Sequence, residues 1–153
     1  MIGEANIKTY FEADHDRLDG LFKEFQALKR SDVVKAGENF KEFKIGLQRH
    51  IIWEEEILFP LFERKTGMTM GPTQVMRMEH RQIRDHLEAI ARKVSVRDPN
   101  SDADEAGLLS VLSAHNQKEE MILYPAVDRS IDDADRASVF EAMKKIPQER
   151  YSM

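Results

Sequence analysis

Two stretches of the chain, HIIWEEEILFP at residues 50–60 and HNQKEEMILYP at residues 115–125, follow one pattern. Both read H-x-x-x-E-E-x-I-L-aromatic-P, and the second begins 65 positions after the first. The same offset relates His15 to His80. Helices that only pack together have no reason to repeat histidines and glutamates at a fixed separation. The repeat therefore indicates a symmetric metal site.

Apolar residues recur at helical spacing along almost the whole chain, and no alternating strand pattern appears. The spacing predicts long helices over about 5–29, 32–64, 72–96 and 103–129, and a short C-terminal helix over about 134–145. Short links favour an all-α, up-down-up-down antiparallel four-helix bundle. The offset relates its two helical hairpins by a pseudo-two-fold axis. Pro60 and Pro125 share one repeat position, and each is expected to kink or end its helix.

The bulk composition bounds the class of protein. The 153 residues suit one domain, with the bundle at about 5–130 and a tail at 131–153. The net charge of −5, with both signs interspersed, argues against nucleic acid as a main partner. The absence of cysteine leaves only nitrogen and oxygen ligands for a metal. No secretory signal or membrane span is recognisable, so we expect a cytoplasmic protein without membrane contact.

The repeated motif places its polar residues on the inward face of each helix. Residues i and i+4 lie about 40° apart around a helix axis, so His50 and Glu54 share a face, as do His115 and Glu119. The flanking apolar positions indicate that this face is buried: Leu47, Ile51 and Leu58 beside the first pair, and Leu112, Ile122 and Leu123 beside the second. Buried carboxylates and imidazoles without partners would cost several kcal/mol each, and a shared metal removes that cost.

One imidazole from each long helix and two carboxylates make a set of four nitrogen and two oxygen ligands. The predicted metal ligands are His15, His50, Glu54, His80, His115 and Glu119. Divided symmetrically, His15 and His50 hold one metal and His80 and His115 hold the other, while both glutamates bridge the two. Imidazole with carboxylate suits iron, and zinc or manganese less distinctively. An open position would remain for a small ligand.

The order H … HxxxE … H … HxxxE, with its EExxLFP-type continuation, resembles the hemerythrin-like (HHE cation-binding) family over about residues 5–129. The resemblance implies a four-helix bundle with two non-haem iron ions, bridged by carboxylates and by an oxo or hydroxo group. Members of that family bind dioxygen or nitric oxide, react with peroxide, sense iron or oxygen, or support repair of iron–sulfur clusters. The six predicted ligands match the ligand positions of the family one by one.

The third long helix departs from the pattern of respiratory hemerythrins. Those proteins carry HxxxH there, which would require a histidine where this chain has Arg84. The repeat relates Arg84 to Asp19, one turn after His15. We therefore expect an Asp19–Arg84 ion pair beside the metals, or Asp19 as a direct ligand, with Arg84 tuning reactivity. Repair proteins also carry a cysteine-bearing segment, which this sequence lacks.

Other repeated or conspicuous residues have plainer interpretations. Glu55 and Glu120 lie about 100° from the ligand face, so they are expected in solvent or behind the ligands. Asp14 and Glu79 are expected in solvent, with orientation of a ligand histidine as the alternative. His86 is expected at the surface or an interface. Three aromatic residues are expected in the core, namely Trp53, Phe59 and Tyr124.

These features predict a di-iron centre that binds or reacts with dioxygen, nitric oxide or peroxide, with catalase-like or oxidase turnover as the enzymatic form. The alternative is a non-catalytic iron or oxygen sensor, or another iron-handling protein. A bundle without a physiological metal is a third interpretation. A ferritin-like site is disfavoured, because only Glu12 and His15 offer its Glu-x-x-His spacing.

Overall fold

The computed structural model describes residues 6–152, which are helical and contain no strand. The long helices are α1 (Ile7–Leu28), α2 (Val33–Trp53), α4 (Pro72–Ser95) and α5 (Asp102–Lys118). The second and fourth continue through π-helical turns, Glu54–Leu58 and Glu119–Leu123, into α3 (Phe59–Thr66) and α6 (Tyr124–Ser130). The predicted start of the first helix at residue 5 lies outside the described residues. The predicted boundaries otherwise agree within two residues.

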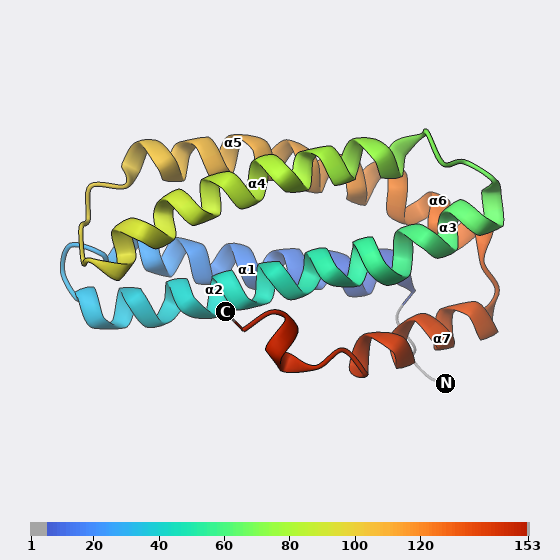
Figure 1. The fold of residues 1–153 in the computed structure, drawn as a ribbon, viewed down its shortest axis with the longest axis horizontal. Helices are drawn as coiled ribbons and strands as arrows, with labels where there is room; N and C mark the ends of the chain where they lie inside the picture. The colour runs from blue at the N-terminus through green and yellow to red at the C-terminus, as the bar shows by residue number, and fades with distance from the viewer. Residues whose placement is uncertain (1–5, 153) are drawn as a thin grey trace.

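The helices form an antiparallel bundle in which each lies beside the next along the chain (Figure 1). Helix α1 packs on α2 and α6, and α4 packs on α5 and α2. Helices α1 and α4 therefore lie diagonally across the bundle. This arrangement confirms the predicted all-α bundle.

Capping residues mark the ends of several helices. The side chain of Asn6 accepts from the Thr9 amide at 2.8 Å, and Asp32 accepts from the Lys35 amide, so both helix starts are capped. Helix α3 is followed by its C-cap residue Gly67, whose φ of 72° lies in the left-handed region that glycine adopts without strain. Ser101, at the N-cap position of α5, makes no cap bond, and its hydroxyl instead donates to Glu105 at 2.5 Å.

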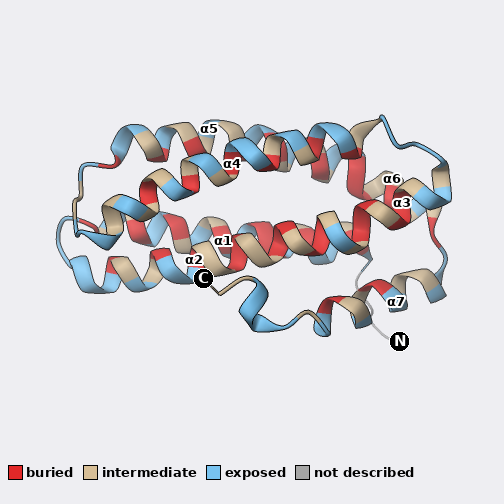
Figure 2. Cartoon of the chain, in the orientation of Figure 1, coloured by how far each residue is buried: buried red, intermediate tan, exposed pale blue. Residues whose placement is uncertain are grey.

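Buried residues line the inward faces of the helices (Figure 2). The apolar ones form two clusters, one on each side of a buried polar layer. The cluster at the end of the bundle that carries the α1–α2 and α4–α5 loops includes Phe22, Phe43, Leu87 and Leu108. The cluster at the end formed by α3 and α6 includes Phe11, Phe59, Tyr124 and Val127, and residues of α7 cover it. The polar layer is thereby sealed from both ends of the bundle.

The C-terminal part folds back along the bundle. Helix α7 (Asp133–Lys144) begins with a capping box at Asp132 and packs against the π turn at 54–58. A short 3-10 helix, Gln148–Arg150, follows, and the Tyr151 carbonyl accepts from the Gln48 side chain at 2.7 Å. Within residues 6–152, no helix has the length and apolar character needed to cross a membrane.

Candidate metal centre

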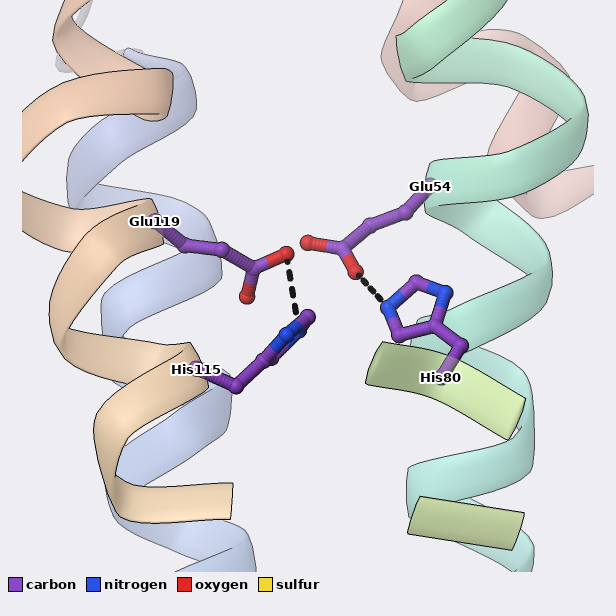
Figure 3. Close-up of side chains that lie close together, drawn as sticks. All are labelled: Glu54, His80, His115 and Glu119. Atoms are coloured by element: carbon purple, nitrogen blue, oxygen red, sulfur yellow. Dashed lines mark hydrogen bonds and ion pairs between the residues drawn. The ribbon is translucent and has the colours of Figure 1, made fainter. Parts of the chain in front are cut away.

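The buried polar layer contains the six residues predicted as ligands. Each of the four long helices contributes one histidine, and the glutamates begin the two π turns. All six residues are at most 3% exposed, namely His15, His50, Glu54, His80, His115 and Glu119. Figure 3 shows Glu54 and Glu119 pointing at each other across the bundle, with His80 and His115 beside them.

The π turns follow from the prolines of the repeated motif. Pro60 has no N–H, and its ring would crowd the carbonyl four residues before it in an α-helix. The chain responds by widening, so the Phe59 amide donates to the Glu54 carbonyl, five residues back. The Tyr124 amide bonds to Glu119 in the same way, one residue before Pro125. Neither proline ends its helix, because both helices continue through a wider turn into α3 and α6, so that part of the expectation was wrong.

The extra residue in each π turn also changes which side chains face inward. Leu123 is 1% exposed, whereas Ile122, expected to flank the second ligand pair, is 60% exposed. Tyr124, five residues after Glu119, is fully buried. In an α-helix residue i+5 lies about 140° from residue i, so only the wider turn lets Tyr124 share the face of Glu119.

The imidazole Nε2 atoms point at the glutamates in the middle of the layer. His50 Nε2 lies 3.4 Å from Glu54 Oε2, and His80 Nε2 lies 3.0 Å from Glu54 Oε1. His15 and His115 each place Nε2 3.2 Å from an oxygen of Glu119. Both carboxylates therefore link histidines from two different helices.

The opposite ring nitrogen of every histidine contacts a further carboxylate from a neighbouring helix. The Nδ1 of His15 lies 2.7 Å from Glu120, and the Nδ1 of His80 lies 2.7 Å from Glu55. His50 pairs with Asp14 and His115 pairs with Glu79, each at 2.9 Å. A carboxylate can only accept, so each Nδ1 carries the proton and Nε2 is the atom directed to the centre.

These four outer contacts form a closed ring around the bundle. Asp14 of α1 holds a histidine of α2, and Glu55 after α2 holds one of α4. Glu79 of α4 holds one of α5, and Glu120 after α5 holds one of α1. The expectation of solvent exposure was wrong for Asp14, which is 9% exposed, and orientation of a histidine is the arrangement found. The available signal was the 65-residue repetition of all four acids.

The charges of this layer compensate one another. Burial alone would lower the pKa of His50, but Glu54 and Asp14 outweigh it and raise that pKa to about 10. Burial opposes the same shift at His80, where Glu54 and Glu55 raise the pKa to about 9. Burial would raise the pKa of Glu54, yet His50 and its other partners hold that pKa well below its usual range. Without a cation, protonated His50 and His80 are thus favoured beside an ionised Glu54.

The donor atoms fit a metal ion. Glu54, His80, His115 and Glu119 each offer a donor within 4.8 Å of the others, as do His15, His50 and Glu119. Glu119 Oε2 is buried without a hydrogen bond of good geometry, although His115 Nε2 lies 3.2 Å away. A small cavity of about 10 Å³ lies among these side chains. Carboxylate-held imidazoles around an orphaned buried oxygen are the arrangement typical of metal ligands.

Tyr124 is a residue of this layer that the sequence interpretation missed. Its hydroxyl lies 2.5 Å from Glu54 Oε2 and 2.9 Å from Glu119 Oε1. The same oxygen lies 3.1 Å from His50 Nε2 and 3.3 Å from His15 Nε2. The tyrosine was expected in the core, and it is buried there, but its polar end belongs to the ligand layer. The only signal was that Tyr124 replaces Phe59 in the second copy of the motif.

The expected ion pair between Asp19 and Arg84 does not form. Arg84 instead donates to Glu55 at 3.2 Å, and its side chain is 42% exposed. The reason is geometric: α1 and α4 lie diagonally across the bundle (Figure 1), and Arg84 pairs with Glu55 on the π turn that follows the adjacent α2. Asp19 does line the small central cavity, and burial raises the pKa of its carboxyl.

The remaining singled-out residues lie outside the layer. His86 is half-buried on α4, next to Gly107 of α5, where an added Cβ would come within 2.7 Å of the imidazole. Trp53 is buried between α1 and α2, and the Arg49 guanidinium stacks on it at 4.7 Å. Phe59 stacks on His80 with ring centroids 5.9 Å apart.

A family model described as "Hemerythrin HHE cation binding domain" matches residues 6–127. A curated protein of Nostoc sp. (strain PCC 7120), named "DNA nickase", is 27% identical over 150 residues. That match covers 96% of this chain and 41% of the relative, so this chain spans less than half the length of the Nostoc protein. No solved structure matches the chain.

Proposed function

Because the chain belongs to the hemerythrin HHE cation-binding domain family, we propose that it holds two non-haem iron ions and binds a small ligand there. The ligand is dioxygen, nitric oxide or peroxide. The observation that carries the proposal is the inward set of four Nε2 atoms, each imidazole held from behind by a carboxylate. Such outer contacts fix ring orientation and raise the basicity of the ligand nitrogen.

The histidines divide into two half-sites. The rings of His15 and His50 lie 4.6 Å apart, and those of His80 and His115 lie 4.8 Å apart. We define the first pair as half-site 1 and the second as half-site 2, and propose that each holds one metal. Glu54 and Glu119 reach across the layer, which supports their proposed role as bridges.

Bound iron would supply redox chemistry and a place for the small ligand, while the protein fixes its geometry and access. The apolar clusters on both sides exclude bulk water from the layer. Glu54 and Glu119 balance the charge of the cations, and the Nδ1 partners keep each imidazole in one tautomer. Asp19 also lines the cavity, and we propose that its carboxyl lies beside the incoming ligand.

Metal analysis after iron-replete expression tests the proposal first. We expect about two iron ions per chain in the native protein. His80→Ala should lose iron, because it removes one of two imidazoles of half-site 2. His86→Asn is the matched control on the same helix, since His86 contacts Gly107 rather than the layer. Equal iron content in all three proteins, or none in the native protein, would contradict the proposed centre.

Reaction with small ligands separates carriage from catalysis. The protein is reduced without oxygen, and dioxygen, nitric oxide and peroxide are added in separate samples. A stable new absorption band with dioxygen or nitric oxide indicates binding, and rapid loss of peroxide indicates turnover. No response to any of the three would contradict the small-ligand proposal. In that case unfolding or a change of partner on metal removal would support the alternative of an iron or oxygen sensor.

The Nostoc relative raises DNA nicking as a second candidate function. That name belongs to a protein of which this chain matches 41%, and acidic residues outnumber basic residues 28 to 23 here. We rank this candidate below small-ligand binding for those reasons. Conversion of supercoiled plasmid to the open circle by native protein, and not by His80→Ala, would reverse the ranking.

A further inference from the structure

The Tyr124 hydroxyl has more close polar neighbours than a hydroxyl can satisfy. A phenol offers one proton and two lone pairs, so it supports at most about three hydrogen bonds. Four donor atoms of the ligand layer lie within 3.3 Å of this oxygen. Two of them belong to Glu54 and Glu119, which only accept when ionised, and one proton cannot serve both. A cation held among these atoms would remove the conflict.

The four distances match those between neighbouring donors on one metal ion. Donors bound at roughly 2.1 Å and at right angles lie about 3.0 Å apart. The Tyr124 oxygen lies 2.5, 2.9, 3.1 and 3.3 Å from Glu54, Glu119, His50 and His15. These four side chains are the donors proposed for half-site 1. The hydroxyl therefore lies where a fifth donor to that metal belongs.

The other copy of the motif lacks this donor. Phe59 occupies the equivalent position, five residues after Glu54, and is also fully buried. Its ring stacks on His80 with an interplanar angle of 12° and offers no polar atom to half-site 2. The two half-sites are thus related by the repeat but differ in one oxygen.

We propose that Tyr124 is a ligand of the metal at half-site 1, and that Phe59 leaves the corresponding position at half-site 2 open for the small ligand. The proposal rests on the proposed function and adds which metal receives the ligand.

Spectroscopy of the ferric protein tests the ligation directly, without an activity assay. A tyrosine bound to ferric iron gives a visible charge-transfer band, and resonance Raman excitation in that band shows tyrosine ring vibrations. The chain has three tyrosines, so Tyr10→Phe and Tyr151→Phe serve as controls. We expect both to retain the band and Tyr124→Phe to lose it, with iron content and helicity preserved.

The reverse substitution checks the second half of the proposal and does not depend on how Tyr124→Phe folds. Phe59→Tyr should strengthen the band and lower the affinity of the ferrous protein for nitric oxide by at least tenfold. Native protein that binds iron without a tyrosine band would overturn the ligation of Tyr124. Unchanged nitric oxide affinity in Phe59→Tyr would overturn the open position at half-site 2. Failure to bind iron at all would instead overturn the proposed function.

Discussion

Each predicted ligand histidine is held in its orientation by a carboxylate at its Nδ1 atom. Glu55 holds His80 at 2.7 Å and also pairs with Arg84. Glu55→Gln replaces a charge-assisted bond by a neutral one, and loss of such a contact weakens metal affinity by about 10- to 100-fold. We expect a loss in the lower part of that range, measured by competition with a chelator of known affinity.

The neighbouring Glu56 provides the control for that measurement. Glu56 pairs with Arg150 at the surface and does not contact the layer. Glu56→Gln should therefore keep native affinity. If Glu55→Gln binds metal as tightly as Glu56→Gln, the outer carboxylates do not determine affinity.

Among the residues that the structure describes, Glu55 is the partner of Arg84, and Glu55 in turn holds His80. Its side chain is 42% exposed, and ion pairs of that kind contribute about 0–1 kcal/mol. We expect Arg84→Gln to lower metal affinity by no more than about fivefold in the same chelator competition. A loss as large as that of Glu55→Gln would restore the expectation that this arginine tunes the site directly.

At the scale of the helices, α1 and α2 approach each other at Gly46. A Cβ at this position would lie 2.6 Å from Leu18 Cδ2 and 2.8 Å from an Arg17 nitrogen. Leu18 is buried in the core and has little room to yield. Gly46→Ala should cost about 1–3 kcal/mol from overpacking, which exceeds the ~1 kcal/mol gained in helix propensity.

Denaturation in urea, followed by circular dichroism, measures this cost against a control on the same helix. Gly37 has nothing within 4 Å of its added Cβ, so Gly37→Ala should stabilise the protein by up to about 1 kcal/mol. Equal stability of the two variants would show that the helices separate freely at Gly46.

A buried ion pair joins the C-terminal end of α1 to α5, near the α1–α2 and α4–α5 loops. Lys29 is 6% exposed, and its ammonium lies 2.6 Å from the Glu105 carboxylate. Removal of one partner leaves the other charge buried, so Lys29→Met should lower the free energy of unfolding by about 3–5 kcal/mol.

Arg30→Met is the matched control for that pair, because Arg30 contacts Asp102 at the exposed surface. Its cost should be at most about 1 kcal/mol. Both variants should keep native metal content, since the pair lies away from the ligand layer. Similar costs for the two substitutions would mean that Lys29 is not held as a buried charge.

At the scale of the whole molecule, the bound metal should stabilise the fold. The layer joins all four long helices, and a ligand present at 1,000 times its Kd adds about 4 kcal/mol of stability. For a chain of this size, that corresponds to roughly 10 °C in Tm. Calorimetry of native protein with and without chelator should show this difference, and His86→Asn should keep it. An identical Tm in both states would contradict a metal that links the helices.

Much of the fold follows from local patterns. The helical spacing of apolar residues predicted the bundle and the helix boundaries, and the structure confirms that class of fold. The 65-residue repeat singled out six residues, and the structure brings their side chains together. Their roles as ligands stay predictions until a metal is measured.

The errors have two origins, which are the relation between helices and the local departure of the π turns from the α-helical period. The repeat suggested that Asp19 faces Arg84, but it relates helices that lie diagonally, so Arg84 pairs with Glu55 instead. Ile122 was expected inside, but the π turn rotates it outward. Tyr124 was expected only in the core, and the same turn brings its hydroxyl into the ligand layer.

The sequence alone established which residues share a helix face, because that depends on a fixed period of about 3.6 residues per turn. It thereby determined the six inward polar side chains and the two-fold repetition of the bundle. The tertiary structure decided which carboxylate holds each histidine, and that the Tyr124 hydroxyl reaches the ligand layer. Those contacts depend on which helices are neighbours and how far each is rotated, and no spacing within one helix contains that information.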